Sequence, residues 1–154
     1  MQVEQVLDAV ATMTGDVQRG QQLVSELSCT ACHTFSANET AKGPFLGAIA
    51  TKFPVRRNLA EQIISPNKEV AQGFRGNHIQ LRDETELDVF VVTEAADAIT
   101  VRTTAGIERR ILKSTIATRE EKAQSLMPEG LVGNISVKDF ASLVDYLQSL
   151  AAQP

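Results

Sequence analysis

Apolar residues recur at helical spacing at both ends of this chain and predict the helices that frame it. Over residues 2–13, one helical face collects four aliphatic side chains, Val3, Val6, Leu7 and Val10. Thr14-Gly15-Asp16 ends this helix and starts a second over residues 16–28, with an inward stripe of Gly20, Leu23, Val24 and Leu27. A last helix begins near Ser136, with Asp139 in capping-box position, and buries a stripe of Phe140, Leu143, Val144, Leu147 and Leu150.

After the second helix the pattern predicts a long loop and then one short helix. Gly43-Pro44 and Gly47 mark residues 34–58 as a loop. Its apolar side chains fit either a pocket wall or ordinary core: Phe35, Phe45, Leu46, Ile49 and Phe53. The short helix has Asn58 as its expected cap, with Glu61 three residues later, and Pro66 ends it.

Residues 73–121 change to the alternating pattern of half-buried strands. The segments 74–81, 87–93, 98–103 and 107–112 are rich in β-branched residues, and turn residues separate them. We expect an antiparallel meander of three or four strands inside an otherwise mainly α chain. His78 is expected to be an ordinary strand residue, because no catalytic constellation surrounds it.

The length and composition of the chain are typical of a single globular domain. The chain has 154 residues, of which 43% are hydrophobic and 22% are charged. A formal net charge of -4 disfavours nucleic acid as a partner. No apolar run approaches the length of a membrane span, and the start lacks the pattern of a signal peptide.

The candidate chemistry lies in Cys29-Thr30-Ala31-Cys32-His33, a CxxCH run that uses both cysteines of the chain. This spacing is typical of c-type haem attachment. Two thiols three positions apart can each bond one vinyl-derived carbon of the same porphyrin. The imidazole of His33 can then bind the iron as the proximal ligand.

Three other interpretations of the motif remain. A disulfide would close a very small loop and contribute little stability. A thioredoxin-like redox pair would follow a strand and open a helix, whereas the residues before Cys29 are predicted to be helical. A zinc site would need Cys29, Cys32, His33 and His78 together, and the adjacency of Cys32 and His33 makes tetrahedral ligation awkward.

A loop with the sequence Ser-Leu-Met-Pro-Glu-Gly, residues 125–130, precedes the last helix and completes a resemblance. The order of helix, CxxCH, Gly-Pro loop, short helix, methionine loop and final helix resembles class I cytochromes c. The resemblance implies that Met127 is the distal iron ligand and that the Pro44 carbonyl orients the His33 ring. It also implies that the first and last family helices cross at Gly20 and Tyr146. Val24 departs from the aromatic residue that many members have.

A closer resemblance is to the haem-binding domain family first described in planctomycete and verrucomicrobial proteins. The strand-rich segment before the Ser125–Gly130 loop carries this likeness, which runs from about Gly15 to Leu150. It implies a cytochrome c domain over 14–154, with an inserted β segment at 74–121 and an N-terminal extension helix at 1–13. Such domains often end large secreted proteins beside sugar-dehydrogenase-like propellers, so a fused or associated dehydrogenase is an expected partner.

Together these features predict a mainly α cytochrome c fold with a small inserted antiparallel sheet. The expected cofactor is one covalent haem c with its iron. The expected function is one-electron exchange with redox partner proteins, without catalytic residues of the chain's own. Because bacteria attach haem covalently outside the cytoplasm, the chain is expected to be periplasmic or otherwise exported, as a mature form or as a domain of a longer protein. The alternatives are a haem sensor in which a small ligand displaces Met127, and a haem-free thiol redox domain.

Overall fold

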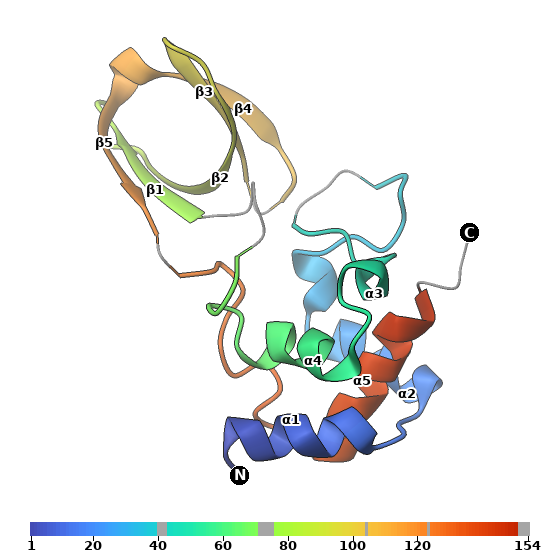
Figure 1. Ribbon diagram of the computed structural model, residues 1–154. Coiled ribbons are helices and arrows are strands. Elements are labelled where there is room, and N and C mark those ends of the chain that lie inside the picture. The colour runs from blue at the N-terminus through green and yellow to red at the C-terminus, as the bar shows by residue number, and fades with distance from the viewer. Residues whose placement is uncertain (40–42, 71–75, 104, 123, 151–154) are drawn as a thin grey trace.

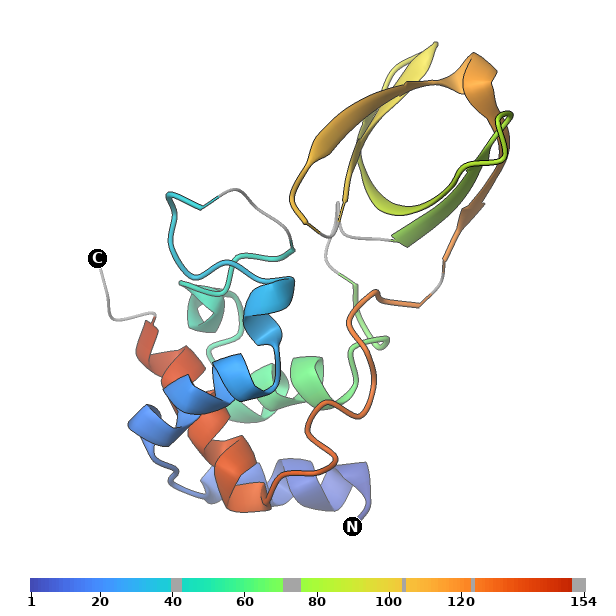
Figure 2. The same ribbon diagram turned by 180° about the vertical axis from the view of Figure 1, so that it is seen from behind.

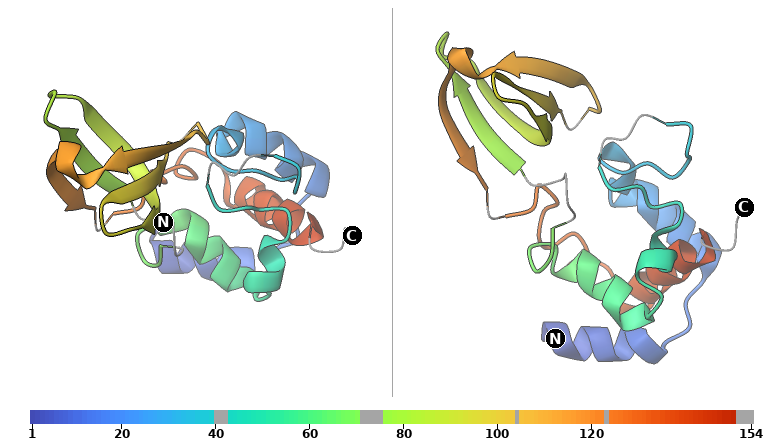
Figure 3. Two further views of the ribbon diagram at one scale, coloured as in Figure 1. Left: turned by 90° about the horizontal axis from the view of Figure 1, so that it is seen from above. Right: turned by 45° about the horizontal axis from the view of Figure 1, so that its top comes forward.

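The computed structural model describes residues 1–39, 43–70, 76–103, 105–122 and 124–150, which form a helical body and a curled sheet (Figure 1). The helical body contains α1 (Val3–Thr12), α2 (Val17–Glu26), the 3-10 turn η1 (Cys29–Ala31), α3 (Ile49–Lys52), α4 (Arg56–Ile64) and α5 (Val137–Leu150). The sheet lies to one side of the helices in every view (Figures 2 and 3). None of the described helices is long and apolar enough to cross a membrane.

The crossing of α2 and α5 is the centre of the helical body. A Cβ atom added at Gly20 would lie 2.0 Å from the Ser142 carbonyl oxygen and 2.6 Å from Tyr146 Cβ, so the helices meet where α2 has no side chain. The predicted contact of Gly20 with Tyr146 is therefore confirmed. At the start of α2, the Asp16 carboxylate caps the helix by accepting hydrogen bonds from the backbone N–H groups of Gln18 and Arg19 at 2.8 and 3.1 Å.

The α1 helix packs into the same core as α2, α4 and α5. Leu7 and Val10 are fully buried in that core. From α4, the Arg56 guanidinium donates to the carbonyl oxygens of Val10 at 2.6 Å and Met13 at 2.7 Å, and it forms an ion pair with Asp145 of α5. This arginine therefore joins three helices and satisfies the carbonyl groups at the end of α1.

The strand-rich segment forms a five-stranded antiparallel sheet in the order β4-β3-β2-β1-β5. Its strands are β1 (Gly76–Leu81), β2 (Glu86–Glu94), β3 (Ala98–Arg102), β4 (Glu108–Leu112) and β5 (Ile116–Glu121). Inward-facing aliphatic residues give the sheet its own core of Ile79, Leu81, Val89, Ile99, Val101 and Ile111. Figure 1 shows that the sheet curls round on itself, and these six residues are buried on its inner face.

The two edge strands are joined by a single 3-10 turn, η2 (Lys113–Thr115). Glu94, at the end of β2, accepts from Lys113 and from Arg119 of β5, each at 3.0 Å. These two cations hold the pKa of Glu94 below its usual value by hydrogen bonding to the charged carboxylate. The ion pairs tie η2 and β5 back to β2 and favour the curled shape.

Several expectations need correction. The sheet has five strands instead of the three or four expected, so the fold is mixed rather than mainly α. Within the short helix, Asn58 is the third residue of α4 and Val55 occupies the cap position. The expected start of the first strand at residue 74 lies outside the described residues. The last helix does begin after Ser136, whose hydroxyl accepts from the Asp139 N–H at 3.0 Å.

Candidate functional site

A sharp turn after α2 presents both cysteines of the CxxCH motif. Ser28 adopts a left-handed conformation, with φ of 60°, and breaks the helix. The η1 turn that follows is closed by hydrogen bonds from the N–H groups of Cys32 and His33 to the Cys29 carbonyl at 3.2 and 2.9 Å. The two free thiols therefore lie at the two ends of one turn, three positions apart, with Cys29 half-buried and Cys32 exposed.

The environment of Cys29 is unlike that of a reactive redox cysteine. Burial raises the pKa of its thiol above the usual range, whereas redox-active thiols have a lowered pKa. In addition, α2 rather than a strand precedes the motif. These two features argue against the thioredoxin-like interpretation.

His33 is held in a defined orientation and protonation state. Its Nδ1 lies 2.7 Å from the Pro44 carbonyl oxygen, which can only accept, so Nδ1 carries the proton and Nε2 keeps its lone pair. Burial lowers the pKa of His33 more than the Pro44 hydrogen bond raises it, and this favours the neutral ring. A neutral imidazole oriented through its other nitrogen is the form that binds metals.

The segment that supplies the Pro44 carbonyl packs tightly on the haem motif. A Cβ atom added at Gly43 would lie only 2.3 Å from the Cys32 carbonyl oxygen. The close approach therefore requires glycine at position 43, and it brings the next residue, Pro44, to the His33 ring.

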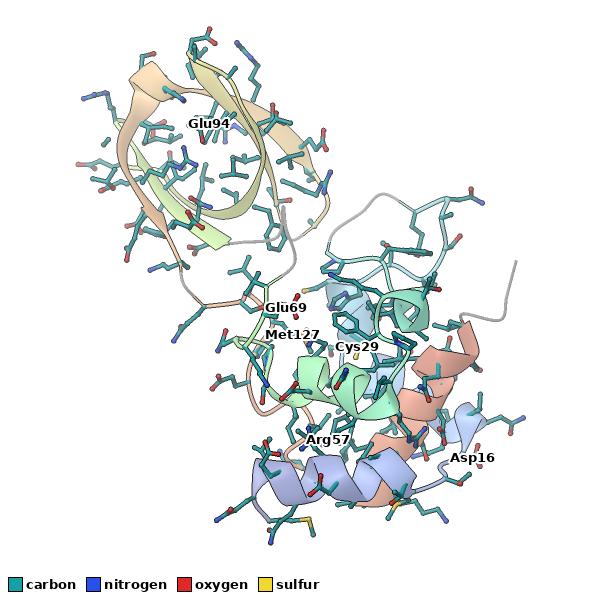
Figure 4. The ribbon with its side chains drawn as sticks, viewed as in Figure 1. Asp16, Cys29, Arg57, Glu69, Glu94 and Met127 are labelled. Atoms are coloured by element: carbon teal, nitrogen blue, oxygen red, sulfur yellow. The ribbon has the colours of Figure 1, made fainter. Side chains whose placement is uncertain are left out.

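Cys29, Cys32, His33, Pro44 and Met127 all line one cavity of about 360 Å³. Its walls come from α2, α3, α4, α5, η1, β2 and the loop before α5, and they are mostly apolar. The charged side chains of Lys52 and Glu69 also reach the cavity but belong to exposed residues. In Figure 4, Met127 and Cys29 face this region from different segments. The fold thus brings all five predicted site residues together.

The predicted pocket wall is only partly correct. Leu46, Ile49 and Phe53 line the cavity. Phe45 is instead 42% exposed, and the Phe35 ring packs 6.5 Å from the ring of Tyr146. Phe35 therefore supplies an aromatic contact to α5, while Val24 is buried at the cavity wall.

The sequence pattern did not identify Phe90 of β2 as a wall residue. Phe90 is 5% exposed although it points away from the sheet's own core, and it lines the cavity. Gly76, its partner across the β1–β2 pair, faces Leu126 of the methionine loop. One feature of the sequence could have identified Phe90: it is a bulky aromatic residue at a position where alternation predicts the outer face of the strand.

His78 lies on the outer face of the sheet rather than at the cavity. Its Nδ1 is 2.9 Å from the Asp88 carboxylate, whose hydrogen bond raises the pKa of His78. The residues that line the cavity do not include His78. Across the described ranges, no cluster of three or more His, Cys, Asp or Glu side chains could hold a metal. The four-ligand zinc interpretation therefore lacks its fourth residue.

The donor set and the apolar walls fit a covalently bound haem. Two thiols on one turn, a neutral imidazole with a free Nε2 and a soft thioether face one apolar space. The Cytochrome c family model matches residues 17–151 of the chain. No curated protein gives a significant match. With its CxxCH turn facing an apolar cavity and the family model spanning most of its length, the chain belongs to the cytochrome c family, whose haem c serves electron transfer.

Proposed function

We propose that the protein transfers single electrons through one haem c joined to Cys29 and Cys32, with His33 and Met127 as axial ligands. The observation that carries this proposal is the free Nε2 of His33, directed by the Pro44 hydrogen bond, in an apolar cavity that Met127 also lines. The bound haem supplies the Fe(III)/Fe(II) couple, and the chain supplies its environment.

Each residue has a physical role in this proposal. The Pro44 carbonyl fixes the His33 ring and increases its basicity toward the metal. The Met127 thioether favours Fe(II) and raises the reduction potential relative to a second imidazole. The apolar walls would keep water from the iron of a bound haem. With His33 and Met127 both holding that iron, no position would remain on it for substrate activation.

We also propose a finer assignment of family and setting. The Ser125–Gly130 loop and the sheet placed before it support membership of the planctomycete- and verrucomicrobial-type haem-binding domains. Residues 14–154 then form the cytochrome domain, 74–121 its insert and 1–13 an extension. The domain is exported or periplasmic and exchanges electrons with redox partner proteins, among them a fused or associated dehydrogenase.

Covalent attachment is tested with protein matured through a cytochrome c assembly route. Intact-mass measurement should show one added haem, and acid-acetone extraction should leave it on the chain. Replacing both thiols, Cys29→Ala with Cys32→Ala, should give protein from which the same extraction removes any haem. Removal of the haem from the wild-type chain, or a mass gain of two haems, would contradict the proposal.

A further inference from the structure

Asn67 joins both sides of the loop that carries Met127. Its Oδ1 accepts a hydrogen bond from the Ser125 N–H at 2.6 Å, and its Nδ2 donates to Glu129 Oε1 at 2.6 Å. The Ser125 hydroxyl in turn accepts from the Met127 N–H at 3.1 Å. One amide side chain therefore connects to the loop both before and after the methionine.

The loop has little other regular structure to hold it. Residues 124–136, here named the distal loop, contain no helix or strand. Gly130 has a positive φ of 83°, and its carbonyl accepts from the Gly133 N–H at 3.0 Å. Since a methionine side chain is flexible, the position of its sulfur depends on how firmly the backbone on each side is held.

Asn67 is itself anchored outside the cavity. It follows α4 and the buried Pro66, while the neighbouring Lys68 N–H donates to the Ser65 carbonyl at 3.1 Å. Asn67 does not line the cavity, whereas Pro66, Ser125 and Met127 do. The asparagine can therefore act on a cavity ligand only through the distal loop.

We propose that Asn67 is a positioning residue that holds the distal loop closed and so keeps Met127 on the haem iron. This inference rests on the proposed His33/Met127 ligation. Without Asn67, the half-buried Ser125 N–H loses its acceptor, and the exposed Glu129 carboxylate loses its donor. Conformations in which the thioether has left the iron then become more populated.

The test measures how easily an external ligand displaces the methionine. Imidazole is titrated into oxidised, haem-loaded protein while the weak near-infrared sulfur-to-iron band is followed. The apparent imidazole affinity scales with the population of the open loop. Asn67→Ala should raise this affinity about tenfold, the effect expected when roughly two ordinary hydrogen bonds are lost. Asn58→Ala, at an exposed position of α4, is the matched control and should leave it unchanged.

Variants of Glu129, which accepts the Asn67 Nδ2 hydrogen bond, distinguish the loss of this contact from a general loss of stability. Glu129→Ala should raise the imidazole affinity about threefold, because one exposed hydrogen bond is lost. Glu129→Gln keeps an oxygen acceptor for Asn67 Nδ2 and should stay within about twofold of wild type. If Asn67→Ala does not take up haem, the comparison of Glu129→Ala with Glu129→Gln decides the question.

The outcomes distinguish this inference from the proposed ligation. Absence of the sulfur-to-iron band in the wild-type protein would refute Met127 ligation itself. A normal wild-type band, with unchanged imidazole affinity in folded Asn67→Ala and Glu129→Ala, would refute only the role of Asn67.

Discussion

His33 and His78 show how two identical side chains acquire different roles from their surroundings. His33 is half-buried, its Nδ1 donates to the Pro44 carbonyl, and desolvation lowers its pKa. His78 lies on a strand beside Asp88, and its pKa is raised. The first environment favours a neutral metal ligand, and the second favours a protonated ring in an ion pair.

His78→Gln should leave the haem spectrum unchanged and alter only the pH dependence of stability. A raised folded-state pKa stabilises the native protein below the unfolded value of about 6.5, and this stabilisation is lost as pH rises through the folded-state pKa. Urea unfolding of wild type and variant should therefore differ more near pH 5 than near pH 8.5. A changed Soret band in the variant would contradict the assignment of His78 to the sheet alone.

Local sequence identified some site residues and missed others for physical reasons. Cys29, Cys32 and His33 are contiguous, so their chemistry is visible in the sequence itself. Asn67 is separated from Ser125 and Glu129 by the whole strand segment in the sequence. An asparagine that follows a proline matches no local pattern that would predict this long-range contact. The role of Phe90 in the cavity wall was missed for a similar reason. Alternation assigns Phe90 to the outer face of the strand but does not predict which part of the protein covers that face.

At the scale of elements, the crossing of α2 and α5 forms part of the cavity wall beside the haem motif. The cavity is lined by Val24 of α2, by Leu27 at the C-terminal cap of α2, and by Leu143 and Leu147 of α5. The angle between these helices therefore sets the position of the cavity wall. Gly20 permits the close approach. The crossing thus connects a glycine in the sequence to the shape of the site.

Gly20→Ala should destabilise the folded protein even though alanine is the better helix former. The added Cβ would overlap the Ser142 carbonyl and Tyr146, and overpacking of this kind costs about 1–3 kcal/mol, against roughly 1 kcal/mol gained in helix propensity. Because the overlap is with a backbone oxygen, we expect a cost near the upper end of that range, and denaturant unfolding should show a net loss of about 2 kcal/mol. Gln21→Ala, at the exposed next position, is the control. A Gly20→Ala protein as stable as wild type would contradict the tight crossing.

The helices were easier to predict than the last strand. Caps and a 3.6-residue apolar period are local features, and they identified α2 and α5. In β5 only Ile116 is half-buried, and the other five residues are exposed, so the strand has no alternating pattern. β5 pairs with β1, which is distant in the sequence, so the backbone hydrogen bonds between them cannot be predicted from a short window of sequence.

At the scale of the whole molecule, the curled sheet contributes to the site of the helical body. The two units have separate cores, yet Phe90 extends from β2 to the cavity and Gly76 of β1 faces Leu126. The inserted sheet is thus part of the cavity wall rather than a separate appendage.

Phe90→Ala should lower the reduction potential of the haem-loaded protein. Removing the ring admits water to an apolar cavity, and solvent exposure favours the more highly charged Fe(III) state. We expect a decrease of about 20–60 mV, where about 59 mV corresponds to a tenfold change for one electron. Leu112→Ala, at an exposed position of β4, should not shift the potential. An unchanged potential in Phe90→Ala would show that the sheet does not shield the haem.

The most direct test of His33/Met127 ligation is the Soret band of the reduced protein before and after carbon monoxide is added at neutral pH. We expect the wild-type band to stay unchanged, because Met127 fills the distal position, whereas Met127→Ala should bind carbon monoxide rapidly and completely. Wild-type binding as fast and complete as that of Met127→Ala would contradict the electron-carrier function and favour a haem sensor.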